Sequence, residues 1–191
     1  MDNNLKGSVS LYELSGNDWN YDSKIENLKV LIKNTKCEDA INLVRTKGSI
    51  GDLKISNALF DGLDADFSNL IIKNIEINNS GNDCMDFSYG EYFLSKLDLS
   101  KCSDKAISTG ESSNLTINEF VIKDSIIGIA SKDSAIVNSK NGFIENVDKC
   151  LSLYKKKQEF NGGFLKYKNV NCQNYKEFAF KDNFSKLIEV N

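Results

Sequence analysis

The sequence predicts an all-β fold, a right-handed single-stranded parallel β-helix of about six to seven coils with a cap at each end. The first observation is that small and apolar residues recur every 22 residues along most of the chain. The second is that the repeat unit alternates apolar and polar residues, as a strand with one buried face does. The third is that so short a unit cannot bury its apolar face alone, so the units must stack.

Three columns of residues, each with members 22 positions apart, carry the repeat. The first column holds small residues and the other two hold apolar ones. The first is Ala40, Gly62, Cys84, Ala106, Gly128, Cys150 and Cys172. The second is Ile41, Leu63, Met85, Ile107, Ile129 and Leu151. The third is Ile55, Ile77, Leu99, Val121, Phe143 and Leu165.

Short strands and turns make up each unit. Residues 67–77 and 113–122 alternate at period two, and turn residues separate such runs at 79–82, 88–90 and 161–163. The spacing excludes helical repeats, and the signature of leucine-rich repeats is missing. Stacked coils would therefore place equivalent strands about 4.8 Å apart.

One domain is expected to fill residues 1–191. Residues 1–35 are predicted to form a first irregular coil and N-terminal cap, with Trp19 in the core. Residues 36–172 form the regular coils, and residues 173–191 form a C-terminal cap, because an open strand edge invites aggregation. A partner-binding tail is the alternative for this last segment.

Composition excludes several classes of function. The net charge of −3 argues against a nucleic-acid ligand, and the absence of histidine excludes Ser-His-Asp and Cys-His catalysis. No apolar run is long enough to span a bilayer. The first residues lack the features of a signal peptide, which favours the cytoplasm, with the cell surface as the alternative for a module of a larger protein. Five cysteines without CxxC spacing are predicted to be buried or incidental thiols.

The outward positions of one strand carry the candidate chemistry. One column contains Asp61, Asp83 and Lys105, and the neighbouring column contains Asp64 and Asp86. Like charges one strand spacing apart repel each other by roughly 4 kcal/mol at an effective dielectric constant of 20. Such carboxylates should share a proton, bind a cation or recruit a lysine.

The candidate site follows from these columns. The catalytic candidates are Asp83, Asp86 and Lys105. The ligand-binding candidates are Asp61, Asp64, Ser108, Glu111, Lys132, Asp133, Tyr154 and Lys156. No metal ligands and no cofactor are assigned, although a calcium ion at Asp61, Asp83, Asp64 and Asp86 is an alternative.

Two runs resemble known families. The runs at 81–86 and 104–108 resemble the polygalacturonase family, with Asn82 and Lys105 replacing its first aspartate and its histidine. Residues 60–165 resemble β-helix modules attached to CotH-like spore-coat proteins and to other bacterial surface or polysaccharide-related proteins. The matching runs start at Asp83, Asp104 and Lys132 and end at Tyr154–Lys157. This resemblance implies a pectin-lyase-like β-helix appended to a larger protein.

The expected function is that of a polysaccharide-interacting module of a larger bacterial protein, which binds glycan on an Asp- and Lys-lined face. The first alternative is a glycosidase, lyase or epimerase that uses Asp83 or Asp86 with Lys105. The second is a structural or oligomerisation module. The expected partners are a polysaccharide or oligosaccharide and either another copy or neighbouring domains, with no nucleic acid and no membrane span.

Overall fold

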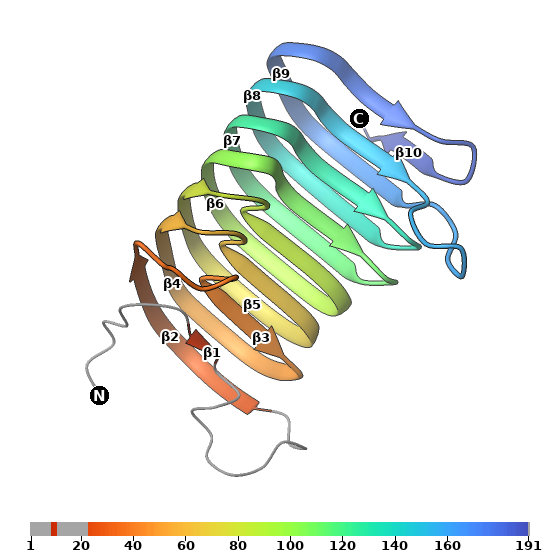
Figure 1. The fold of residues 1–191 in the computed structure, drawn as a ribbon. Coiled ribbons are helices and arrows are strands. Elements are labelled where there is room, and N and C mark those ends of the chain that lie inside the picture. Colours follow the sequence, from red (N-terminus) through yellow and green to blue (C-terminus); the bar gives the residue numbers. More distant parts are fainter. Residues whose placement is uncertain (1–8, 11–22, 191) are drawn as a thin grey trace.

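The computed structural model describes residues 9–10 and 23–190, and within them every regular element is a β-strand. The strands stack in parallel along one axis, from the first coils to the last (Figure 1). The strands are β1 (Val9–Ser10), β2 (Ser23–Lys33), β3 (Ile41–Val44), β4 (Thr46–Ala58), β5 (Leu63–Ser80), β6 (Met85–Gly110), β7 (Asn114–Lys132), β8 (Ile136–Tyr154), β9 (Phe164–Lys181) and β10 (Lys186–Glu189). The predicted Trp19 position lies outside the described residues.

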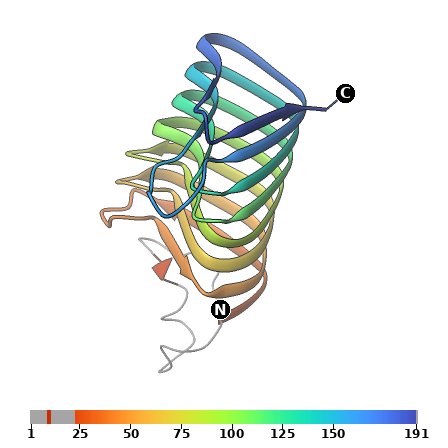
Figure 2. The ribbon, with the colours of Figure 1, turned by 90° about the vertical axis from the view of Figure 1, so that its right-hand side faces the viewer.

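Each coil pairs in parallel with the next, so the predicted parallel β-helix is confirmed. Ile41 lies beside Leu63, and Leu63 beside Met85, each step being 22 residues. About eight turns stack in this way, and in the turned view the strands of successive coils lie over one another (Figure 2). Over the described residues, no helix is long and apolar enough to cross a membrane.

The core forms where inward side chains of successive coils meet. Leu63, Met85, Ile107 and Leu151 of the second predicted column are fully or almost fully buried. The small-residue column lies at a tight bend: a Cβ added to Gly62 would meet the carbonyl oxygen of Cys84 at 2.6 Å. That approach explains the glycine at position 62, and Gly128 approaches the carbonyl oxygen of Cys150 in the same way.

The third predicted column is wrong beyond Leu99. Leu99 pairs with Ile122, and Ile122 with Ile144, so the fully buried positions are these and not Val121 or Phe143. One extra residue in the turn at 111–113 shifts the register. A bulge between Cys102 and Lys105 then restores it.

The last coil is longer than the repeat predicts. Leu151 pairs with Ala179, a step of 28 residues, because residues 155–163 form an inserted loop. Cys172 therefore lies beside Ile144, and Leu165 lies beside Val137, which corrects both column assignments.

Asparagines occupy the corners where the backbone turns left-handed. Asn34, Asn57 and Asn79 have φ between 57° and 67°, a region that asparagine tolerates better than most residues. The Asn57 amide donates to Asn34 at 2.7 Å, and the Asn79 amide donates to Asn57 at 2.8 Å. This ladder fixes the bend from coil to coil.

Two disulfides overturn the prediction that all five cysteines are thiols. Cys84 is bonded to Cys102, Cys150 is bonded to Cys172, and Cys37 is an exposed free thiol. Cys84 precedes β6 and Cys102 lies within it, whereas Cys150 lies in β8 and Cys172 in β9. The 22-residue spacing places Cys84 and Cys102 in different columns and gave no sign of their bond. It did place Cys150 and Cys172 one step apart in the first column, but both were predicted to be thiols.

We expect one cysteine of the native protein, Cys37, to react with an alkylating reagent, and all five to react after reduction and unfolding. The disulfide between Cys84 and Cys102 closes a loop of 18 residues and should stabilise the fold by about 3 kcal/mol. Mass spectrometry after alkylation tests the cysteine reactivities. Urea unfolding of the Cys84→Ser/Cys102→Ser variant tests the stabilisation. Because Cys84 is buried in the folded protein, the deciding sample is the unfolded but unreduced protein, and labelling of Cys84 there would contradict the disulfide.

Candidate functional site

The predicted columns of charged residues lie on the outward face of the short strand segments that follow the bend. Asp64 pairs with Asp86 across the β5–β6 ladder, and Asp66 pairs with Ser88. We use the term acidic face for the outward carboxylates that this stacking brings together: Asp39, Asp61, Asp64, Asp66, Asp83 and Asp86.

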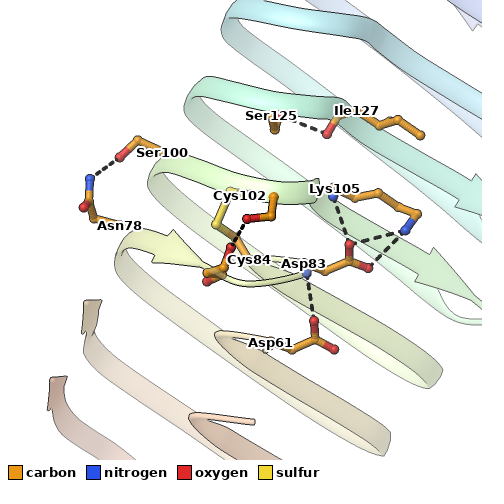
Figure 3. Close-up of a disulfide and its surroundings, with 11 residues drawn as sticks. Asp61, Asn78, Asp83, Cys84, Ser100, Cys102, Lys105, Ser125 and Ile127 are labelled. Carbon is orange, nitrogen blue, oxygen red and sulfur yellow. Dashed lines mark hydrogen bonds and ion pairs between the residues drawn. A yellow bond between two sulfur atoms is a disulfide. The ribbon is translucent and has the colours of Figure 1, made fainter. Parts of the chain in front are cut away.

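In the first column, each carboxylate accepts a hydrogen bond from the backbone of the next coil. Oδ1 of Asp61 accepts from the amide of Asp83 at 2.8 Å, and Oδ1 of Asp83 accepts from the amide of Lys105 at 2.9 Å (Figure 3). Backbone donors stabilise a carboxylate and fix its position. This column is therefore a structural ladder as well as a row of charges.

The ladder ends in an ion-paired lysine. The Lys105 ammonium lies 3.3 Å from Oδ1 of Asp83 and also pairs with Asp104. Burial raises the pKa of Asp83 to about 6, although Lys105 opposes that shift. For Lys105, burial acts to lower the pKa, but the two carboxylates outweigh it and raise the pKa. Asp83 is 2% exposed, so these two catalytic candidates bind one another and offer little surface to a ligand.

The second column, Asp64 and Asp86, is more accessible than the first. Both residues are half-buried, and so is Asp66, which pairs with Ser88 in the next column. Burial, together with the negative charges of Asp66 and Asp86, raises the pKa of Asp64 to about 8. Burial and neighbouring carboxylates also raise the pKa values of Asp39, Asp61 and Asp66. At neutral pH Asp64 therefore carries a proton, as like charges at one strand spacing require.

A buried lysine lies in the neighbouring column, that of Asp66, Ser88 and Gly110. Lys132 is 5% exposed, and its ammonium donates to Oγ of Ser108 at 2.8 Å and lies 3.7 Å from Oδ2 of Asp86. Its aliphatic stem covers Gly110, where an added Cβ would meet Cε of Lys132 at 2.8 Å. Lys132 covers Ser108, which is fully buried, so these two predicted ligand-binding residues are less accessible than the catalytic candidate Asp86.

The inserted loop at 155–163 folds back toward earlier coils. The Lys157 ammonium lies 2.5 Å from Oε1 of Glu111, whose Oε2 accepts from the Ser88 hydroxyl. Burial alone would raise the pKa of Glu111, but the Lys157 and Ser88 contacts lower it. Glu111 therefore anchors the loop.

The base of the same loop contains three predicted ligand-binding residues, Asp133, Tyr154 and Lys156. Oδ1 of Asp133 accepts from the amides of Lys156 and Lys157, both at 2.7 Å. Asp133 is fully buried, Tyr154 is half-buried beside Lys132, and the Lys156 side chain is exposed. The structure thus places Asp133 as a loop-capping residue.

Sequence reasoning missed an aromatic edge beside the acidic face. Phe67 and Tyr89 follow Asp66 and Ser88 at a left-handed corner, and their rings stack at 4.5 Å with 5° between the planes. Phe160 of the inserted loop contacts Tyr89 edge-on, at 6.2 Å between centroids. We call Phe67, Tyr89 and Phe160 the aromatic edge. Phe67 and Tyr89 are 22 positions apart, a spacing that could have indicated their stacking, but the return of Phe160 had no signal in the repeat.

Within residues 9–10 and 23–190, no three acidic or cysteine side chains are placed to hold a metal ion. No protein-family model matches the chain. A search of curated proteins also finds no match.

We expect stability to fall as the pH rises toward 8, because Asp64 of the folded protein keeps its proton up to about pH 8. In the unfolded chain an aspartate loses its proton near pH 3.9. Between these pH values the folded state binds one more proton, so the free energy of unfolding decreases with rising pH.

Urea unfolding at about pH 5 and about pH 8 measures this slope. Asp64→Asn should flatten it and should stabilise the protein at the higher pH by on the order of 1 kcal/mol. Asp98→Asn, on another face of β6 beside Glu76, is the matched control. An unchanged slope in Asp64→Asn would show that Asp64 titrates normally.

Proposed function

We propose that the chain is a polysaccharide-binding β-helix module that holds glycan on the acidic face against the aromatic edge. The observation that carries this proposal is the row of half-buried oxygen acceptors Asp64, Asp66 and Asp86 beside the exposed ring pair of Phe67 and Tyr89. Carboxylates accept hydrogen bonds from sugar hydroxyls. An exposed ring offers an apolar face to the C–H groups of a sugar.

The charge of the face restricts the ligand. Burial first and neighbouring carboxylates second raise the pKa values of Asp39, Asp61 and Asp64, and no cation among the described residues opposes these shifts. The pKa of Asp66 is raised in the same way, although Lys157 opposes the shift. A uronate or sulfate placed there would meet the same repulsion. The proposed ligand of this face is therefore a neutral polysaccharide or oligosaccharide.

We expect Phe67→Ala and Tyr89→Ala each to weaken glycan binding by roughly twofold to tenfold, the range that one aromatic contact supplies. Phe93→Ala is the matched control, because Phe93 is 36% exposed, as Tyr89 is, but lies on another face. Isothermal titration with neutral polysaccharides measures the affinities. Equal effects of the Tyr89 and Phe93 substitutions would refute the assignment of this face.

The pKa of Asp64 favours a second candidate function, hydrolysis of a glycosidic bond. Asp64 carries a proton at neutral pH, and the neighbouring Asp86 has a lysine ammonium at 3.7 Å to stabilise its charge. Asp64 would donate its proton to the leaving oxygen while the Asp86 carboxylate attacks the anomeric carbon. Water would then hydrolyse the glycosyl ester. Asp64 and Asp86 lie on adjacent coils, and the spacing of adjacent strands suits the separation of about 5 Å between the two carboxyl groups of a retaining enzyme.

Reducing-end release on a polysaccharide panel tests this candidate. Asp64→Asn and Asp86→Asn should each abolish release, Asp98→Asn should not, and the rate should fall above about pH 8 as Asp64 loses its proton. A rate that survives both substitutions would leave the binding proposal standing and remove the catalytic one.

We also propose an oxidising location, such as the cell surface, because disulfides persist mainly outside reducing compartments. The relation to pectin-lyase-like and CotH-associated modules is part of this proposal. It is supported by the runs starting at Asp83, Asp104 and Lys132.

A further inference from the structure

A separate trough lies on another outward face, over the strands β7, β8 and β9. It has a volume of about 210 Å³. Two outward columns form its sides. The first pairs Thr116 with Asn138 and Asn138 with Lys166, and the second pairs Lys140 with Lys168. We call this feature the basic trough, formed by Thr116, Asn118, Asn138, Lys140, Lys166 and Lys168.

The trough is lined by donors and by no carboxylate. Three ammonium groups, two amides and one hydroxyl line it, and Lys140 and Lys166 form no ion pair with a carboxylate among residues 23–190. Two acids border the trough: Glu119 directly follows Asn118, and Glu189 hydrogen-bonds the Tyr167 hydroxyl. The charge of the trough is therefore opposite to that of the acidic face.

We infer that the basic trough binds an acidic saccharide, whose carboxylate or sulfate contacts Lys140 and Lys166 and whose hydroxyls contact Asn118 and Asn138. Ammonium groups suit oxyanions, and side-chain amides suit sugar hydroxyls. A nucleic acid fits less well. The only ring in the trough, that of Tyr167, is 7% exposed, so no base can stack on it.

The inference does not rest on the proposed function of the acidic face. The two sites lie on different faces and select ligands of opposite character, because the acidic face repels anions and the trough attracts them. A variant of one site should therefore leave ligand binding at the other site unchanged, which provides an internal control.

Isothermal titration of the full chain with trigalacturonate, a sulfated trisaccharide and a neutral trisaccharide tests the inference. We expect both anionic sugars to bind and to bind more weakly as salt is added. Lys140→Gln/Lys166→Gln should weaken binding by roughly tenfold or more, since it removes two charge-assisted hydrogen bonds. Lys73→Gln/Lys101→Gln, which removes two exposed lysines outside the trough, should leave the affinity unchanged, and so should Asp64→Asn.

Three outcomes would overturn the inference. The first is equal binding of the anionic and neutral trisaccharides. The second is unchanged binding in Lys140→Gln/Lys166→Gln. The third is a single-stranded oligonucleotide that binds as tightly as the saccharides and loses affinity in the same variant. Loss of neutral-glycan binding in Phe67→Ala concerns the acidic face alone.

Discussion

The structure depends on parallel hydrogen bonding between consecutive coils in one register. That register places residues 22 positions apart side by side, so a pattern that is weak along the chain becomes a continuous column in space. Apolar columns face inward and make one core, while polar columns face outward. The asparagine ladder and the backbone-bound Asp61 and Asp83 are products of the same stacking.

Stacking also has an electrostatic cost, and the candidate site arises from it. Carboxylates that repeat with the coils cannot avoid one another, so Asp83 recruits Lys105 and Asp64 keeps a proton. The Lys132 ammonium likewise lies close to the Asp86 carboxylate and offsets its charge. The fold tolerates these charges by pairing some of them and neutralising others, which leaves a face that is acidic, half-buried and bordered by rings.

The sequence predicted the coils and the meeting of Asp61, Asp83 and Lys105, because both depend only on a constant spacing. It failed wherever the spacing changed. One extra residue near Ser112 moved Ile122 into the place predicted for Val121, and six extra residues displaced Cys172. The loop that brings Phe160 to Tyr89 is not part of the repeat. The different roles of Asp83, which accepts a backbone hydrogen bond, and Asp64, which is half-buried with a raised pKa, depend on burial, and the columns do not predict burial.

The titration of the Asp64 carboxyl tests the central claim most directly, because its pKa depends on the register, the burial and the neighbouring charges together. Nuclear magnetic resonance of the side-chain carboxyl carbon, assigned by comparison with Asp64→Asn, follows that one group. A midpoint at about pH 8 is the result that the structure predicts. A midpoint near 3.9, as in an unstructured peptide, would contradict the stacking of Asp64 on Asp86 and the burial of its carboxyl.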